Sequence, residues 1–244
     1  MAVKSIQYNQ NTLDISYEIV NPKAKVDLII LHGWGSNKNL MKQSFSAYMD
    51  TFRHIYIDLP GFGSSTCNST LNTADYARII ELLMVHLNAS KDIILGHSFG
   101  GKVALLLDPT VLVLVGSAGI YVKKPLKIKL KIVLFKALKI FGLRKLRRFF
   151  VAEDAKSLNE YMYQTFKNVV NEDFSQKFSE YEGKALLCWG REDTATPLSS
   201  AEKINTLIKD STLEVYDGDH YFFMNNAEDI SKHIESTYLK TLEH

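Results

Sequence analysis

The chain has 244 residues, of which 46% are hydrophobic and 23% are charged. This composition is typical of a folded globular protein and excludes disordered and fibrous classes. Cys67 and Cys188 lie far apart and belong to no Cys-x-x-Cys pair, so neither a disulfide framework nor a zinc site is expected. The first residues contain no apolar signal segment, and no apolar run approaches about 20 residues, so we expect a cytoplasmic protein.

Basic residues are concentrated in one segment, although the net charge is only +2. Between Asp108 and Glu153 the chain has no acidic residue and eleven basic ones. Elsewhere acidic residues outnumber basic ones, so this segment and the rest of the protein carry opposite charge. Because no acids are interleaved with the bases, ion pairs within a helix do not explain the run, and a partner of negative charge is favoured.

Apolar segments separated by polar turns predict an alternation of strands and helices. The predicted strands, in chain order, are residues 6–8, 15–17, 26–31, 54–58, 93–95, 111–115, 185–189 and 213–216. The predicted helices are residues 40–52, 72–87, 103–107, 199–208 and 227–239. The first two strands flank a polar stretch and predict a β-hairpin. Most later strands are apolar throughout, which is typical of parallel strands buried between two layers of helices.

The alternation of strands and helices pauses between residues 120 and 183. This segment contains the basic run and has helical periodicity, with its apolar residues on one stripe. We therefore expect an α/β fold with a mostly parallel sheet, helices on both of its faces and a helical lid inserted after the sixth strand. Residues 1–119 and 184–244 would form the core, and residues 120–183 would form a basic lid over the carboxyl end of the sheet.

The segment from Ile93 to Gly101 combines a short apolar run with Gly-His-Ser-Phe-Gly and a helix-compatible continuation. A strand, a glycine-flanked serine and a helix in this order are the signature of a nucleophile elbow. Glycines flank the serine because side chains at these positions would collide with the neighbouring strand and helix. Ser98 is therefore the candidate nucleophile, placed above the carboxyl end of the sheet near the positive end of a helix.

A nucleophilic serine needs a base that accepts its proton and an acid that orients the base. On this kind of sheet the acid and then the histidine follow the serine along the chain, each in a loop after a strand. Asp193 follows the strand at 185–189 and His220 follows the last strand, so these two residues complete the candidate triad. Glu192 and Asp219 remain alternative acids.

Five motifs in this order resemble the α/β-hydrolase family over nearly the whole chain. They are HGWG at 32–35, DLPGFG at 58–63, GHSFGG at 96–101, WGRED at 189–193 and GDH at 218–220. The resemblance implies that the backbone N–H groups of Trp34 and Phe99 form an oxyanion hole. A serine nucleophile is unlike the haloalkane dehalogenases and epoxide hydrolases of this fold, which use aspartate. No metal or organic cofactor is implied.

The sequences of two loops, HGWG and DLPGFG, are similar to those of the pimeloyl-acyl carrier protein methyl ester esterases of biotin synthesis. This resemblance implies a serine carboxylesterase that acts on a carrier-bound methyl ester. Hydrolases that cleave carbon–carbon bonds of ring-fission products resemble the chain at 189–193 and are the alternative. Those enzymes usually carry a longer oxyanion loop with glycine and serine, which is absent here.

An acidic acyl carrier protein would complement the basic run, so the predicted lid is the expected docking surface. The residues assigned to this contact are Lys136, Lys139, Arg144, Lys145, Arg147 and Arg148. A membrane surface is the second choice of partner, and it would make the enzyme a lipase. Nucleic acid is not expected, because no binding motif accompanies the charge. A binding scaffold without catalysis is disfavoured by the intact Ser98, Asp193 and His220.

Overall fold

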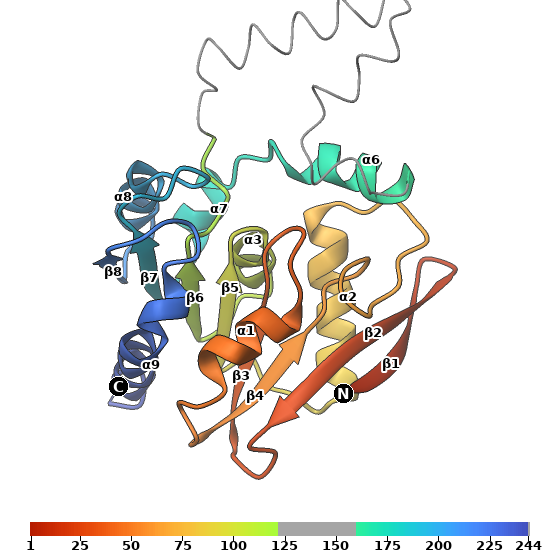
Figure 1. The fold of residues 1–244 in the computed structure, drawn as a ribbon, viewed down its shortest axis with the longest axis horizontal. Helices are drawn as coiled ribbons and strands as arrows, with labels where there is room; N and C mark the ends of the chain where they lie inside the picture. Colours follow the sequence, from red (N-terminus) through yellow and green to blue (C-terminus); the bar gives the residue numbers. More distant parts are fainter. Residues whose placement is uncertain (122–159, 244) are drawn as a thin grey trace, which may run out of the picture.

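An eight-stranded sheet forms the centre of the computed structural model, which describes residues 1–121 and 160–243. The strands are β1 (Ala2–Tyr8), β2 (Asn11–Val20), β3 (Val26–Leu31), β4 (Phe52–Ile57), β5 (Ile93–His97), β6 (Val111–Val115), β7 (Lys184–Gly190) and β8 (Ser211–Tyr216). Their order in the sheet is β1-β2-β4-β3-β5-β6-β7-β8 (Figure 1). The pairs β1–β2 and β2–β4 are antiparallel and all later neighbours are parallel, so the predicted mostly parallel sheet is confirmed.

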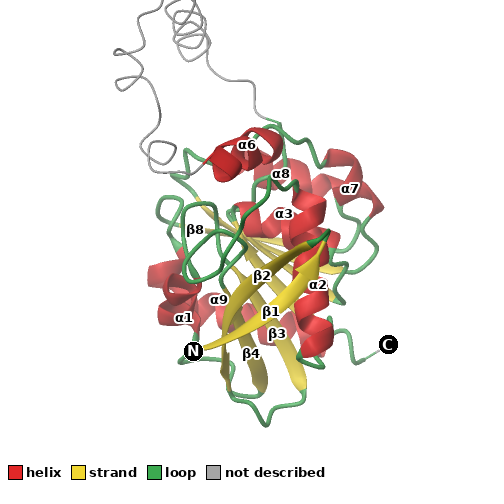
Figure 2. Ribbon diagram, turned by 90° about the vertical axis from the view of Figure 1, so that its right-hand side faces the viewer, coloured by secondary structure: helices red, strands yellow, loops and turns green. Residues whose placement is uncertain are grey.

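Helices cover both faces of the sheet (Figures 1 and 2). The described helices are α1 (Lys38–Phe45), α2 (Thr73–His86), α3 (Phe99–Leu106), α6 (Glu160–Val169), α7 (Ser175–Glu180), α8 (Leu198–Leu207) and α9 (Phe223–Leu239). Successive side chains of β3 point to opposite faces of the sheet. Leu28 and Ile30 belong to the core on the side of α1 and α9, whereas Ile29 and Leu31 belong to the core on the side of α2, α3 and α8. Within the described residues, no helix combines the length and the apolar character needed to cross a bilayer.

Helix α1 ends seven residues earlier than the sequence pattern predicts. It stops at Phe45, and the backbone of Met49 has a φ of 57°, which is incompatible with a continuing helix. The N–H of Phe52 then bonds to the carbonyl of Met49, and β4 begins at Phe52. Phe45, Met49 and Phe52 are all buried in one layer, so the chain folds back at this point to cover the sheet.

Helix α6 lies across the end of the sheet at which the parallel strands finish (Figure 1). The hydroxyl of Thr165 accepts a hydrogen bond from the N–H of Leu71 at 2.9 Å, and the side chain of Asn168 donates to the carbonyl of Leu71 at 3.1 Å. These bonds fasten the helix to the loop that precedes α2. The predicted contact residues from Lys136 to Arg148 lie outside the described part of the chain, as does most of the predicted lid.

A buried ion pair connects the start of α1 with the loop after β4. The Nζ atom of Lys38 lies 2.6 Å from Oδ2 of Asp58, and both side chains are almost completely buried. The same ammonium donates to the hydroxyl of Ser16. Burial alone would raise the pKa of Asp58, but hydrogen bonds from Lys38 and from the N–H of Ser64 outweigh it and lower the pKa. The pair therefore joins the two loops that carry the HGWG and DLPGFG motifs.

The change Asp58→Asn is expected to lower the free energy of unfolding at neutral pH by about 3–5 kcal/mol, because it leaves a buried ammonium without its counterion. The lowered pKa means that this contribution is complete above about pH 4, the ordinary range of an aspartate, and is lost as the pH falls through the folded-state value. Urea unfolding at pH 7 and at decreasing pH checks both statements. Glu228→Gln, in an exposed pair with Lys232, is the control and should leave the free energy of unfolding nearly unchanged.

Candidate active site

Ser98 occupies the turn between β5 and α3 in a strained backbone conformation, with φ of 51° and ψ of −115°. The turn brings the end of β5, the start of α3 and the end of β3 so close together that two positions have no room for a side chain. A Cβ atom on Gly100 would lie 2.6 Å from the carbonyl oxygen of Leu31, and one on Gly96 would collide with the backbone of Gly100. The glycines that flank Ser98 are thus required by the geometry of the elbow.

A cavity of about 480 Å³ opens beside Ser98. Its apolar wall includes Trp34, Phe99 and Phe166, and His220 lines it as well. The Trp34 ring contacts the Phe99 and Phe166 rings, with centroid distances of 5.6 and 5.3 Å. Because Phe166 belongs to α6, this helix supplies part of the cavity wall above the sheet.

The two residues expected to supply oxyanion-hole N–H groups, Trp34 and Phe99, both lie at this cavity. Trp34 is the second residue of a β-turn closed by a 3.1 Å hydrogen bond from Ser36 to Gly33, and that bond does not use the Trp34 N–H. Phe99 is the first residue of α3, so its N–H has no partner within the helix. Both residues line the cavity together with Ser98.

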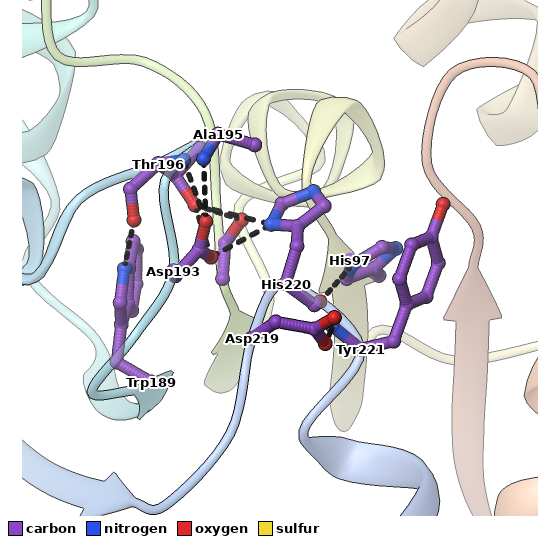
Figure 3. Close-up of polar contacts among 9 residues, drawn as sticks. His97, Trp189, Asp193, Ala195, Thr196, Asp219, His220 and Tyr221 are labelled. Atoms are coloured by element: carbon purple, nitrogen blue, oxygen red, sulfur yellow. Dashed lines mark hydrogen bonds and ion pairs between the residues drawn. The ribbon is translucent and has the colours of Figure 1, made fainter.

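His220 and Asp193 form a hydrogen-bonded pair at the same cavity (Figure 3). The Nδ1 atom of His220 lies 2.7 Å from Oδ2 of Asp193, whose side chain is fully buried. Burial alone would raise the pKa of Asp193, but the bonds from His220 and from the N–H of Thr196 lower it. A carboxylate that stays ionised beside an imidazole fixes the ring and stabilises its protonated form.

The other two acidic residues considered from the sequence have different partners. The carboxylate of Glu192 accepts the N–H of Gly218, and that of Asp219 accepts the N–H of Tyr221 at 2.8 Å. Both residues are exposed, and both bond backbone groups instead of the imidazole. Of the three candidates, Asp193 is the one that the structure brings to the ring of His220.

Thr196 bonds the carboxylate of Asp193 and was not singled out as a site residue from the sequence. Its hydroxyl lies 2.8 Å from Oδ2 of Asp193 and 3.0 Å from the carbonyl oxygen of Gly116. The N–H groups of Ala195 and Thr196 both donate to Oδ1 of Asp193 at 2.8 Å. An aspartate side chain commonly accepts the N–H group two residues further on, so Asp193 in a loop before Ala195 is the signal for this turn in the sequence.

Lys102 was also not singled out, and it lines the cavity one helical turn after Ser98. Its side chain is only 3% exposed. The signal in the sequence is a single charged residue within the otherwise apolar stretch 99–107. No three His, Cys, Asp or Glu side chains in the described ranges 1–121 and 160–243 are grouped so that they could hold a metal ion.

His97, the residue before Ser98, contacts the loop that carries His220. Its Nε2 atom donates to the backbone carbonyl of His220 at 3.1 Å, and its ring lies 4.7 Å from the His220 ring. Nδ1 has no hydrogen-bond partner among the described residues, so Nε2 carries the proton. Burial lowers the pKa of His97 to about 3, which keeps the ring neutral at physiological pH.

The change His97→Phe is expected to lower kcat about tenfold, because it keeps an aromatic ring but removes the donor that holds the His220 loop. Since His97 is neutral, the midpoint of the acid limb of the pH–rate profile is expected to stay in place. Steady-state rates between pH 5 and 9 measure both quantities. His54→Phe is a control with a similarly buried imidazole that bonds Met49 and Tyr56 away from the cavity. A shifted midpoint in His97→Phe would contradict the neutral assignment.

Three proteins of known function are similar to this chain. The 2-hydroxy-6-oxononadienedioate/2-hydroxy-6-oxononatrienedioate hydrolase 1 of Pseudomonas putida is 28% identical in an alignment of 248 positions, gaps included, which covers 86% of each chain. The pimeloyl-[acyl-carrier protein] methyl ester esterase of Vibrio campbellii is 37% identical over 78 residues, 32% of this chain and 29% of the relative. The 1-acylglycerol-3-phosphate O-acyltransferase of Arabidopsis thaliana is 40% identical in an alignment of 104 positions, gaps included, which covers 38% of this chain and 25% of the relative. The last two matches thus span less than a third of these relatives.

The fold is similar to that of solved hydrolase structures, and the sequence matches the model of a protein family. An esterase from Exiguobacterium antarcticum superposes with a TM-score of 0.75 at 22% identity, over 96% of this chain and 98% of that one. The meta-cleavage product hydrolase CumD from Pseudomonas fluorescens superposes with a TM-score of 0.69 at 20% identity, over 98% of both chains. The model of the alpha/beta hydrolase family matches residues 28–232. With the strand order, the elbow and this match in agreement, the chain belongs to the alpha/beta hydrolase family.

Proposed function

We propose that the protein is a serine carboxylesterase with Ser98 as nucleophile, His220 as base and Asp193 as the acid that orients the base. The observation that carries the proposal is the 2.7 Å bond between His220 and the buried Asp193 at the cavity beside Ser98. A serine hydroxyl becomes an effective nucleophile when an adjacent imidazole accepts its proton. An elbow serine, an imidazole and a buried carboxylate together meet the requirements of acyl transfer.

In the proposed reaction, Oγ of Ser98 attacks the ester carbonyl carbon while His220 takes the hydroxyl proton. The carbonyl oxygen becomes an oxyanion, which the N–H groups of Trp34 and Phe99 stabilise, each by about 3 kcal/mol in comparable sites. The tetrahedral intermediate collapses, and His220 passes its proton to the departing alcohol. Water then attacks the acyl-enzyme with His220 as base, which releases the acid and restores Ser98.

We propose the methyl ester of pimeloyl-acyl carrier protein as the substrate. The esterase of Vibrio campbellii, which is named for this substrate, resembles about a third of the chain. An apolar cavity wall of aromatic rings fits a methylene chain. The eleven basic residues between Asp108 and Glu153 complement an acidic carrier, so we propose that residues 120–183 form the lid on which the carrier docks and that 1–119 and 184–244 form the core.

Cleavage of a carbon–carbon bond in a ring-fission product is the second candidate. It is favoured by the hydrolase of Pseudomonas putida, because that match covers 86% of this chain. The same serine, histidine and aspartate would serve either reaction. Parallel assays with a methyl ester and with 2-hydroxy-6-oxononadienedioate separate the two, and a higher kcat/KM for the dienedioate would overturn the esterase proposal.

The test of the substrate compares pimeloyl-acyl carrier protein methyl ester with monomethyl pimelate, which lacks the carrier, at low and high salt. A carrier dock predicts a strong preference for the carrier-bound ester that salt removes, because screening weakens the attraction between the basic lid and the acidic carrier. Equal cleavage of the two esters at both salt concentrations would remove the carrier from the proposal but leave the esterase assignment in place.

Reversal of four lid charges is expected to raise KM for the carrier-bound ester about tenfold or more, with a much smaller effect on monomethyl pimelate. The residues changed to glutamate are Arg144, Lys145, Arg147 and Arg148. A matched control reverses four exposed lysines of the core, namely Lys23, Lys25, Lys209 and Lys240. Equal losses for the two quadruple variants would show that total charge, and not the lid, attracts the carrier.

A further inference from the structure

A second cavity, of about 310 Å³, adjoins the cavity beside Ser98. Four residues line both cavities: Lys102, Ala118, Val170 and Ala195. Two of the four are alanines, whose small side chains leave space where the cavities meet. The second cavity also has polar lining groups, among them Asn171, Glu172 and Thr194. A ligand attached at Ser98 thus has an apolar compartment beside the nucleophile and a more polar one beyond it.

Lys102 lines both cavities, and its ammonium group bonds one further lining residue of each. Its Nζ atom donates to the carbonyl oxygen of Val169 at 2.5 Å and to Oε2 of Glu172 at 2.8 Å. The rings of Phe99 and Phe174 flank it, with centroids 5.5 and 5.0 Å from Nζ. A lysine ammonium has three N–H donors, and the hydrogen bonds within the described residues use two of them.

Glu172 is not an exclusive partner of Lys102. Its side chain is 28% exposed, and its carboxylate also accepts the hydroxyl of Thr73. Burial lowers the pKa of Lys102, while the bond and the charge of Glu172 act in the opposite direction. A charged group that is buried among aromatic rings gains from a further acceptor, because burial removes most of its hydration.

We propose that Lys102 and the second cavity bind the far end of the acyl group, which carries a carbonyl or carboxylate oxygen that accepts a hydrogen bond from Lys102. This inference rests on the proposed esterase function and specifies its substrates as esters of dicarboxylic acids, with the second carboxyl group free or held in a thioester. Lys102 is then a specificity-determining residue of the acyl site. A simple fatty acyl chain would place methyl and methylene groups against the ammonium and would gain no hydrogen bond.

Three methyl esters of equal chain length test the proposal. Methyl heptanoate has no distal oxygen, monomethyl pimelate has a free carboxylate, and the N-acetylcysteamine thioester of monomethyl pimelate has a distal thioester carbonyl. We expect the wild-type protein to prefer at least one of the latter two over methyl heptanoate about tenfold in kcat/KM, mainly through KM. Preference for the carboxylate alone indicates free diacid monoesters, and preference for the thioester indicates carrier-bound substrates.

Variants of the ion pair separate recognition from a structural role. Lys102→Met is expected to reduce the preference about tenfold, and Lys102→Arg to retain most of it because the positive charge is kept. Glu172→Gln is expected to raise the preference for the free carboxylate, because it removes the competing anion and keeps the lysine. Lys177→Met is the matched control: Lys177 is exposed and lies outside both cavities, so the wild-type preference should persist.

Recognition by Lys102 predicts that Lys102→Met lowers the preference for a distal oxygen and that Glu172→Gln raises the preference for the free carboxylate. If the ion pair is merely structural, both variants lose activity on the three esters in the same proportion, and the inference is wrong. If Lys102→Met does not fold, the Glu172→Gln and Lys102→Arg results decide alone. Wild-type protein that cleaves the three esters equally overturns the inference but leaves the esterase function, whereas no cleavage of these esters or of pimeloyl-acyl carrier protein methyl ester overturns both.

Discussion

Replacement of Ser98 by alanine is expected to reduce kcat for ester hydrolysis by roughly 10⁴-fold or more, because it removes the atom that forms the acyl-enzyme. The fold should persist, since alanine keeps the Cβ atom and the elbow depends on Gly96 and Gly100. The positive φ of 51° at this position strains alanine about as much as serine, because both residues carry a Cβ atom. Rates with a methyl ester and urea unfolding of the two proteins measure both expectations.

Ser231→Ala is the matched control for this prediction. Ser231 is also a buried serine, but it lies on α9 and its hydroxyl bonds the carbonyl of Ala227. The control should retain wild-type kcat, whereas Ser98→Ala should lose it at unchanged stability. Ester hydrolysis that survives in purified Ser98→Ala would contradict the proposed nucleophile.

The change Asp193→Asn is expected to lower kcat by about 10⁴-fold with a small change in KM, as the corresponding change does in serine protease triads. The amide still fits among Thr196, Ala195 and His220, but it removes the charge that stabilises a protonated imidazole. The pKa of Asp193 is lowered, so its carboxylate stays ionised down to below about pH 4. The wild-type pH–rate profile above that pH should therefore contain no step from this group.

Glu192→Gln and Asp219→Asn are the controls for the choice of acid. Their carboxylates bond the N–H groups of Gly218 and Tyr221, so their loss should cost less than about tenfold in kcat. If either variant loses as much activity as Asp193→Asn, the pairing of His220 with Asp193 is not the one that operates in catalysis.

Local chemistry explains why much of the fold is predictable from the sequence. Asn9 and Gln10 have φ values of 44° and 63°, as the two-residue turn of the predicted hairpin requires. The predicted helix at 72–87 begins with a capping box of Asn72 and Asp75, with reciprocal bonds of 3.0 and 2.7 Å at the start of α2. In each case the residues that specify the structure are neighbours in the chain.

Features that depend on distant residues were less predictable. The periodicity of α1 continues beyond Phe45, but the chain turns there because Met49 and Phe52 pack into the same layer. A parallel sheet brings the loops after its strands together, so loop position pointed to His220 as base and to Asp193, Glu192 or Asp219 as acid. The contact between Asp193 and His220 is visible only in the structure. The burial of Lys102 depends on Val169 and Glu172, which lie 67 and 70 residues further along the chain. Such a contact leaves no periodic signal in the sequence.

The parallel strands place the residues of the site in four separate loops at one end of the sheet. Trp34 follows β3, Ser98 follows β5, Asp193 follows β7 and His220 follows β8. The strand side chains that pack against the two helical layers project from the faces of the sheet, whereas these loops leave its end. Evolution can therefore exchange one loop, and with it a substrate preference, without rebuilding the core. For the same reason, the opposite end of the sheet is the place to attach this protein to a solid support or to fuse it with another protein.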